Sequence, residues 1–220
     1  MVDPLQLDVL TADRLATCID HEVLAPDHTV TDVAQACADA VAYGFAAVTV
    51  PPYDIARAAQ RLGGTGVAAG GIIGLPHGHS GLKAKRTEAE TCVRAGADEV
   101  EMVINLAAMK SGQFGDVRDE IAAVRTVADG LALKVILECC WLTDDETVRA
   151  CWLAMECGAD FVETATDFGA RGATVHDVAL VWRTVGDGAG VKAAGRIRTL
   201  GQVREMLEAG AVRIGTGDGV

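Results

Sequence analysis

The sequence has 220 residues, of which 50% are hydrophobic and 23% charged, so it can bury a sizeable core as one large domain or two small ones. Its formal net charge of −12 argues against a nucleic acid or an anionic membrane as the main partner. An anionic small molecule is not excluded, because a local site can be basic on an acidic protein.

The cysteines and the N-terminus indicate the compartment. The seven cysteines contain no C-x-x-C pair, which predicts buried, reduced thiols rather than a disulfide framework. The N-terminal segment has early acids and lacks the basic and apolar regions of a signal peptide. No uninterrupted apolar run reaches the length of a membrane-spanning helix. We therefore expect a cytoplasmic protein with no membrane partner.

Eight segments have the apolar, β-branched character of buried strands. In chain order they are 15–20, 42–50, 66–74, 94–103, 132–140, 156–165, 190–195 and 208–217. Four of them repeat one pattern, in which a helical segment passes through a glycine into a β-branched run. These glycines, Gly44, Gly96, Gly158 and Gly210, fit the position just after a helix, where left-handed geometry costs glycine little.

Helical patterns fill the gaps between the strands. Residues 29–43 open with Thr29 and Asp32 at capping-box spacing, and residues 144–157 and 199–209 carry apolar residues at helical intervals. Alternating strands and helices predict a (β/α)8 TIM barrel, as a single domain over residues 1–220, with its eighth helix missing or truncated. A doubly wound open sheet is the alternative, but no G-x-G-x-x-G follows the first strand.

Charged residues interrupt four successive strands. They are Glu101, Lys134, Glu163 and Lys192, and each shares a face with apolar neighbours at a period of two. Neighbouring strands lie about 4.8 Å apart, so these side chains can meet inside one barrel. Two acids and two bases balance, which is the arrangement that a buried cluster tolerates best.

This cluster has a structural and a chemical interpretation. A salt-bridge quartet would only hold the barrel together, although apolar residues often do so equally well. Near the C-terminal ends of barrel strands, ionisable residues more often serve chemistry, and burial can lower a lysine pKa enough to make a base or a nucleophile. The tract 76–85 contains two nearby histidines without a third ligand, so we predict neither a metal nor a cofactor.

From about residue 15 onwards the chain resembles the deoxyribose-phosphate aldolase family, whose members are class I (Schiff-base) aldolases on a TIM barrel. The phrases that carry the resemblance are IDHEVLAPD, VTVPPY, GLPHG, EVEMVIN, LKVILE, GATVHDVAL, GVKAAGRIRTL and RIGTGDGV, in that order. The resemblance implies a lyase that acts on a small carbonyl compound.

The resemblance also places the catalytic residues. The family's strand-6 phrase reads K-T-S-T-G, and its lysine forms the imine, whereas this chain has Glu163 at that position. The family's second lysine matches Lys192, its strand-5 lysine matches Lys134, and its proton-relay aspartate matches Glu101. A carboxylate cannot form an imine, so the family's mechanism cannot run at residue 163.

The remaining expected site residues bind substrate. Asp20 matches the family, whereas Glu22 replaces a threonine and Thr49 a cysteine, and Asn105 ends its strand as a polar anchor. At the phosphate end, where the family reads G-G-I-R-T and G-T-S-S-G, the expected residues are Thr166, Asp167, Gly195, Arg196, Gly215, Gly217 and Asp218. The added carboxylates disfavour a phosphate dianion, so deoxyribose 5-phosphate is not the expected substrate.

Three functions stay open on these residues. The first is an enzyme repurposed for acid/base chemistry on a carbonyl substrate without the phosphate, by aldol-type addition, cyclisation, dehydration or enolisation, with Glu163 and Glu101 as acid and base. The second is an aldolase whose imine has moved to Lys192. The third is a non-catalytic pseudoenzyme or small-molecule binder. The resemblance also implies a homodimer.

Overall fold

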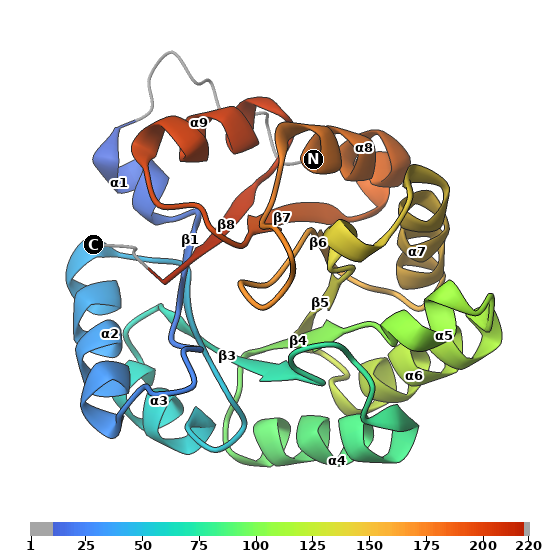
Figure 1. Ribbon diagram of the computed structural model, residues 1–220. Helices are drawn as coiled ribbons and strands as arrows, with labels where there is room; N and C mark the ends of the chain where they lie inside the picture. The colour runs from blue at the N-terminus through green and yellow to red at the C-terminus, as the bar shows by residue number, and fades with distance from the viewer. Residues whose placement is uncertain (1–10, 218–220) are drawn as a thin grey trace.

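Eight parallel strands close into a barrel in the computed structural model, which describes residues 11–217 (Figure 1). The strands are β1 Ile19–Glu22, β2 Ala47–Val50, β3 Ala68–Ile73, β4 Glu99–Val103, β5 Ala132–Ile136, β6 Phe161–Glu163, β7 Gly190–Ala194 and β8 Arg213–Thr216. They follow chain order around the barrel, and β8 closes it by pairing with β1, Ile19 opposite Ile214. The predicted TIM-barrel fold is confirmed.

Helices surround the barrel and alternate with the strands (Figure 1). They are α1 Ala12–Ala16, α2 Val30–Tyr43, α3 Ile55–Leu62, α4 Gly81–Arg94, α5 Leu106–Lys110, α6 Phe114–Val127, α7 Asp144–Glu156, α8 Val175–Val185 and α9 Leu200–Glu208, with 3-10 turns η2 Cys139–Trp141 and η3 Gly186–Gly188. Within residues 11–217 no helix follows β8, and α1 lies beside α9 where they line one cavity (Figure 1).

The residues predicted to begin and end helices do so in the structure. Thr29 caps α2, and Asp32 completes the capping box by accepting the backbone N–H of Thr29. Gly44 ends the same helix in the left-handed region at φ 72°, and Gly158 and Gly210 have φ values of 77° and 113°. Glycine is suited to these conformations because it has no Cβ to clash with the preceding turn.

Several strand boundaries differ from the sequence prediction, and two of these differences matter most for β1 and β5. Leu15 and Ala16 belong to α1, so β1 begins only at Ile19. Cys139 and Cys140 form the 3-10 turn η2 after β5 instead of continuing the strand. Both errors arise because short apolar runs look alike in strands, helices and turns when periodicity is the only signal.

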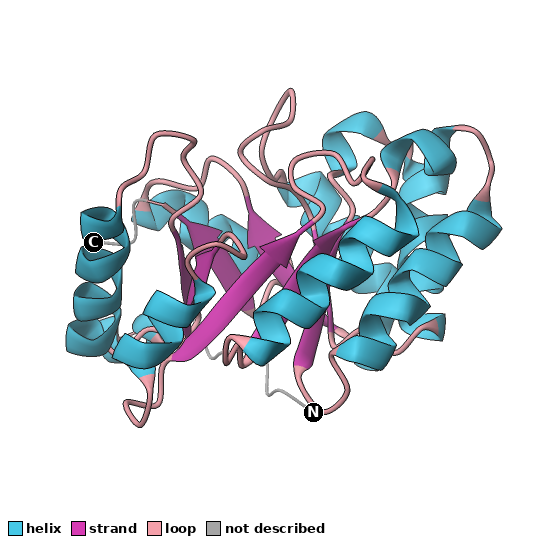
Figure 2. Cartoon of the chain, turned by 90° about the horizontal axis from the view of Figure 1, so that it is seen from below, coloured by secondary structure: helices cyan, strands magenta, loops and turns pink. Residues whose placement is uncertain are grey.

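The barrel separates an apolar outer layer from a charged interior. The outward faces of the strands pack against the helices and form the main hydrophobic core. A small interior cluster of Ile72, Val103 and Ile136 packs with Leu24 and Leu75. Figure 2 shows the strands running towards one end of the barrel, so the loops that follow them gather at that end. TIM-barrel enzymes place their active sites there.

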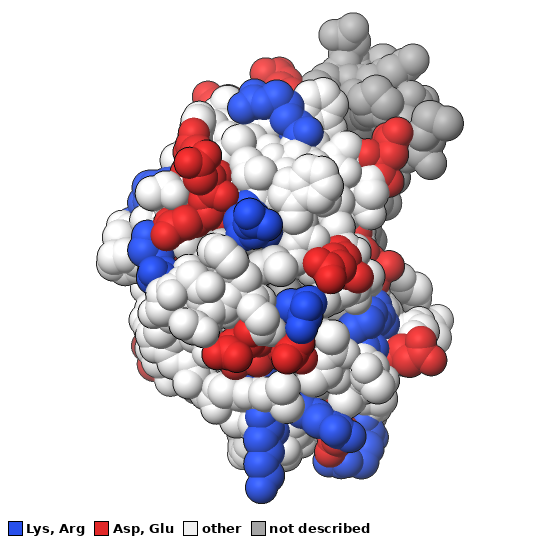
Figure 3. All heavy atoms as spheres, turned by 90° about the vertical axis from the view of Figure 1, so that its right-hand side faces the viewer, with Lys and Arg blue, Asp and Glu red and all other residues white. Residues whose placement is uncertain are grey.

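Charges on the visible outer surface are mixed. Figure 3 shows acidic and basic side chains interspersed on the side that carries α5 and α7, so the net charge of −12 is not concentrated on this face. None of the helices in the described part of the chain is long and apolar enough to cross a membrane.

Candidate active site

Lys134 is held by three carboxylates inside the barrel. Its Nζ lies 2.7 Å from Asp20 Oδ2, 2.6 Å from Glu99 Oε2 and 2.7 Å from Glu101 Oε1. The side chain is fully buried, and a protonated lysine has three N–H donors to offer. Burial alone would lower the pKa of Lys134, but Asp20 and Glu101 outweigh burial and raise it above the ordinary value. The contacts and the raised pKa therefore favour the ammonium form of Lys134 over a free amine.

Lys192 lies in a second carboxylate cage. Its Nζ is 2.9 Å from Glu101 Oε2, 3.0 Å from Glu22 Oε1, 3.3 Å from Asp20 Oδ2 and 3.3 Å from Glu163 Oε1. Burial would lower its pKa, but Glu101 and Glu163 outweigh it and raise the pKa well above the usual lysine value. The hypothesis of a lysine with a lowered pKa is therefore wrong for Lys192, as it is for the other barrel lysine.

The strand register explains why these side chains meet. Glu101 on β4 lies opposite Lys134 on β5, and Glu163 on β6 lies opposite Lys192 on β7. Register partners in a parallel sheet point to the same face, so each pair enters the barrel together. The predicted quartet is confirmed as a set of neighbours, although the complete cluster is larger.

The sequence interpretation missed two members of the cluster. Glu99 contacts Lys134, and Arg213 at the start of β8 donates from Nε to Asp20 Oδ1 at 2.8 Å and from Nη2 to Glu99 Oε2 at 3.1 Å. Both lie two residues from a predicted site residue on the same strand, which is the signal that could have found them. Three cations therefore face five carboxylates: Lys134, Lys192 and Arg213 against Asp20, Glu22, Glu99, Glu101 and Glu163.

Two of these carboxylates are protonated more readily than usual, which reduces the excess of negative charge. Burial raises the pKa of Glu163 well above its ordinary value, and Lys192 offsets this only in part. Burial also raises the pKa of Glu22, to about 7. Glu163 Oε2 is buried and, within residues 11–217, has no hydrogen-bond partner. Glu163 therefore keeps its proton to a higher pH than an ordinary glutamate does.

The carboxylates could be mistaken for metal ligands. Oxygens of Asp20, Glu99 and Glu101 lie within 4.8 Å of one another, and so do those of Glu22, Glu101 and Glu163. Each triad, however, surrounds a lysine Nζ. An ammonium already supplies the positive charge that a metal ion would bring, so these triads do not fit a metal ion.

Other predicted site residues lie around the cluster. Thr49 Oγ1 donates to Glu101 Oε1 at 3.1 Å, and Gly215 leaves the space that Glu22 occupies, because a Cβ there would collide with Glu22 Oε1. Asn105 is instead turned away, since its Nδ2 donates to Glu120 Oε1 at 3.1 Å. Asn105 thus ties helices together and does not face the cluster.

The loop after β6 has its own buried anchor. Thr166 donates its hydroxyl to Glu138, whose Oε2 also accepts the Thr166 backbone N–H at 3.2 Å. Glu138 is fully buried at φ 44°, a left-handed conformation that is uncommon outside glycine. Thr166 therefore positions its loop and does not contact the lysines. Glu138 ends the phrase LKVILE, and its place after an apolar strand was the available signal.

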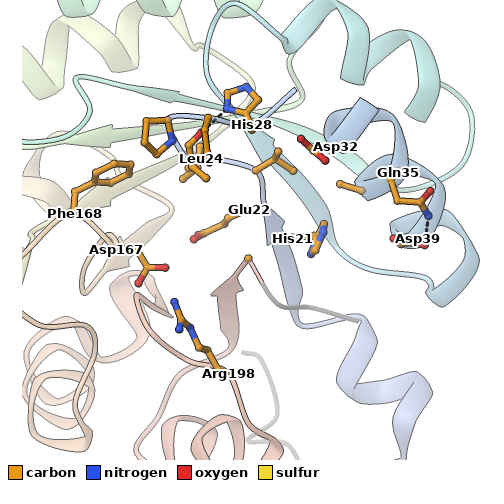
Figure 4. Close-up of a pocket in the computed structure, with 16 residues that line it drawn as sticks. His21, Glu22, Leu24, His28, Asp32, Gln35, Asp39, Asp167, Phe168 and Arg198 are labelled. Atoms are coloured by element: carbon orange, nitrogen blue, oxygen red, sulfur yellow. Dashed lines mark hydrogen bonds between the residues drawn. The ribbon is translucent and has the colours of Figure 1, made fainter. Parts of the chain in front are cut away.

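A cavity opens beside the cluster at the C-terminal ends of the strands. It has a volume of about 640 Å³ and is lined by Glu22, Asp167, Phe168, Arg198 and Gly217 together with the loop after β1 and α2 as far as Asp39. Figure 4 shows Glu22 at its centre, with Asp167 and Arg198 on the opposite side from Asp32 and Gln35. Gly195 and Arg196 belong to the adjoining loop after β7, and Asp218 lies outside the described residues.

The fold and this cluster define a TIM-barrel protein in which Glu22 and Glu163 lie at the C-terminal ends of β1 and β6, where that fold places catalysis. The family model described as DeoC/LacD family aldolase matches residues 14–216, and the chain belongs to this family.

Individual relatives agree with this assignment. The deoxyribose-phosphate aldolase of Brevibacillus brevis is 46% identical over 202 residues, which cover 92% of this chain and 91% of that one. The enzyme of the same name from Thermococcus kodakarensis is 47% identical over 211 residues, covering 94% of each chain. The solved structure of deoxyribose phosphate aldolase from Aeropyrum pernix, described as tetrameric, superposes with a TM-score of 0.89 at 30% identity and covers 99% of this chain and 94% of that one.

Proposed function

We propose that this member of the aldolase family performs general acid/base chemistry on a small, unphosphorylated carbonyl compound, without an imine. The observation that carries the proposal is the pair Glu163 and Glu22. Their carboxylate oxygens lie within 4.8 Å of each other, both pKa values are raised, and Glu22 faces the cavity. Neighbouring acids with raised but different pKa values provide a proton donor and a proton acceptor at neutral pH.

The proposed step is enolisation. Ionised Glu22 removes a proton from the carbon next to the carbonyl, and the electrons of that C–H bond form the C=C bond. The carbonyl π electrons move to oxygen, which takes the proton of Glu163. The products are the enol, protonated Glu22 and ionised Glu163, whose new charge lies 3.3 Å from Lys192 Nζ. Aldol addition, retro-aldol cleavage and dehydration share this step.

The role of base goes to Glu22 in place of Glu101. Glu101 is fully buried, bridges both lysines and accepts a third hydrogen bond from Thr49. Burial would raise its pKa, but Lys134 and Lys192 outweigh burial and lower it, which makes Glu101 a weak base. We propose that Glu101 holds the two lysines in place.

Proton exchange in D₂O tests this function directly. Acetaldehyde, 2-deoxyribose and dihydroxyacetone are incubated with the protein, and loss of the proton next to the carbonyl is followed by NMR. We expect exchange of at least one compound above the buffer rate, and a loss of about 10²- to 10⁴-fold in Glu163→Gln. Glu205→Gln, which makes the same change at an exposed acid on α9 outside the cluster, is the control and should retain exchange. No exchange with the unaltered protein would refute the proposal in favour of a non-catalytic binder.

An imine at Lys192 is the alternative that the structure supports least. Four carboxylates surround its Nζ, and the raised pKa leaves almost no neutral amine at neutral pH. Treatment with acetaldehyde and borohydride should therefore give no mass adduct. A stoichiometric adduct on Lys192 would overturn the acid/base proposal and restore an aldolase with a displaced imine.

A further inference from the structure

The loop after β7 presents backbone N–H groups where TIM barrels commonly bind phosphate. In this fold the phosphate site is often formed by the loops after strands 7 and 8 and a helix N-terminus. Here the corresponding segment runs from Gly195 to the first turn of α9. The hydrogen-bond partners of its N–H groups therefore determine whether an anion can be bound.

Three of these N–H groups already have acceptors within the protein. The backbone N–H of Arg196 donates to Asp167 Oδ1 at 2.6 Å. The N–H groups of Arg198 and Thr199 donate to the side-chain oxygen of Gln202, at 2.9 and 3.2 Å. A phosphate would have to displace these acceptors. Of the two acceptor side chains, only that of Asp167 is a carboxylate, and it reaches across from the loop after β6.

The Arg196 side chain completes the connection between the two loops. Its guanidinium donates to the carbonyl oxygens of Ala170 at 3.2 Å and Gly169 at 3.0 Å, both in the loop after β6. Its positive charge is thus turned towards that loop, while its backbone holds φ 58°, which is unfavourable for a residue with a Cβ. The two loops therefore bind each other through Asp167 in one direction and Arg196 in the other.

We propose that Asp167 is the residue that excludes phosphate esters from this site, because its carboxylate takes the anion position on the Arg196 N–H. A phosphate in the cavity would compete with a tethered carboxylate and would also be repelled by it. A neutral substrate tail meets neither obstacle. This inference deepens the proposed function, whose unphosphorylated substrate class it explains, but it concerns binding and not the chemical step.

Three variants distinguish the effect of the Asp167 charge from the effect of its hydrogen bond to the Arg196 backbone N–H. Asp167→Asn removes the charge while leaving an oxygen that can still accept the N–H, and Asp167→Gly removes both. Asp27→Asn makes the same charge change at another residue that lines the cavity, and Asp27 accepts none of the three N–H groups. Circular dichroism and the Tm without ligand establish that each variant is folded.

Binding of inorganic phosphate, deoxyribose 5-phosphate and deoxyribose is then measured by calorimetry. We expect no phosphate binding by the unaltered protein at millimolar concentration, and affinity for both phosphates that rises from Asp167→Asn to Asp167→Gly by about tenfold or more. Asp27→Asn should remain like the unaltered protein, and deoxyribose affinity should change little in any variant.

Two results would overturn the proposal. One is phosphate binding by the unaltered protein as tight as that of Asp167→Gly, and the other is a folded Asp167→Gly that still rejects phosphate. If Asp27→Asn and Asp167→Asn increased the affinity for phosphate equally, the exclusion would be a general effect of negative charge around the cavity and not a property of Asp167. None of these binding results depends on turnover. The proposed chemistry fails if the unaltered protein shows no proton exchange or if Glu163→Gln retains it, so its failure is distinguishable from failure of this inference.

Discussion

Glu101 and Glu163 are both buried in one cluster, but their electrostatic roles are opposite. Glu101 contacts Lys134 at 2.7 Å and Lys192 at 2.9 Å, and these cations hold its pKa below the usual range despite burial. Among the described residues Glu163 forms an ion pair with Lys192 alone, at 3.3 Å, and burial raises its pKa. Removing the charge of Glu101 thus leaves two buried cations with less compensation, whereas the raised pKa of Glu163 means that this residue supplies less of the compensating charge.

This contrast predicts a difference in stability. Glu101→Gln should lower the free energy of unfolding by about 3–5 kcal/mol, because it breaks a buried ion-pair network. Glu163→Gln should lower it by less than about 1 kcal/mol, since burial favours the neutral form of Glu163 and an amide has a similar shape. Urea denaturation at pH 7 measures both, and similar losses would mean that Glu163 is ionised in the folded protein.

The raised pKa of Glu22 predicts how stability depends on pH. In the unfolded chain a glutamate has a pKa of about 4.3, whereas in the folded protein that of Glu22 is about 7. The folded state therefore binds more protons in this window, so the contribution of Glu22 is fully present below about 4.3 and is lost as the pH rises towards 7.

The measurement is a set of urea curves between pH 4.5 and 8 for the unaltered protein and Glu22→Gln. The difference in unfolding free energy between the two proteins should shift by a few kcal/mol across this range, the unaltered protein losing stability relative to the variant as pH rises. A constant difference would show that Glu22 titrates at the same pH in both states.

At the scale of elements, a second buried ion pair connects α4 with α6. Lys85 Nζ lies 2.6 Å from Glu120 Oε2, and both side chains are buried. Asn105, at the start of α5, donates to the same carboxylate. This explains why Asn105, which the sequence suggested for substrate binding, belongs instead to the attachment of helices outside the barrel.

The pair predicts strong coupling between its partners. Lys85→Met should lower the free energy of unfolding by about 3–5 kcal/mol because it leaves Glu120 buried without its cation. The double change Lys85→Met with Glu120→Leu should recover much of this loss, since well-packed apolar residues can replace a buried pair. A double-mutant cycle by urea denaturation gives the coupling energy. If the losses in unfolding free energy of the two single variants simply add in the double variant, the predicted coupling is absent.

At the scale of the whole molecule, large apolar side chains lie exposed on the outer helices. Trp152 on α7 is 58% exposed and Trp182 on α8 is 52% exposed, and these helices pack against each other. Tryptophan is enriched in protein–protein interfaces, where burial of its ring is most favourable. These residues support the expectation of a homodimer.

Sedimentation equilibrium checks this expectation. We predict a dimer that Trp152→Arg or Trp182→Arg weakens by tenfold or more, whereas Arg183→Ala, beside Trp182 in the sequence, should leave it unchanged. A monomer at all concentrations would refute the prediction. A tetramer would correct it towards the assembly described for the Aeropyrum pernix relative.

The sequence by itself determined the barrel and most of the residues inside it. The eight strand patterns and the glycines after the helices depend on local backbone chemistry, and the period-two placement of Glu101, Lys134, Glu163 and Lys192 fixes which face they share. These features can be recognised without knowledge of distant parts of the chain.

Only the tertiary structure decided the charge states and the partners. Whether Lys192 is an amine or an ammonium depends on carboxylates from β1, β4 and β6. Burial strengthens the effect of these charges on the pKa of Lys192. The contact of Asp167 with Arg196 likewise joins loops that only barrel closure brings together. A pKa and a loop-to-loop hydrogen bond follow from positions in space, which sequence spacing alone does not specify.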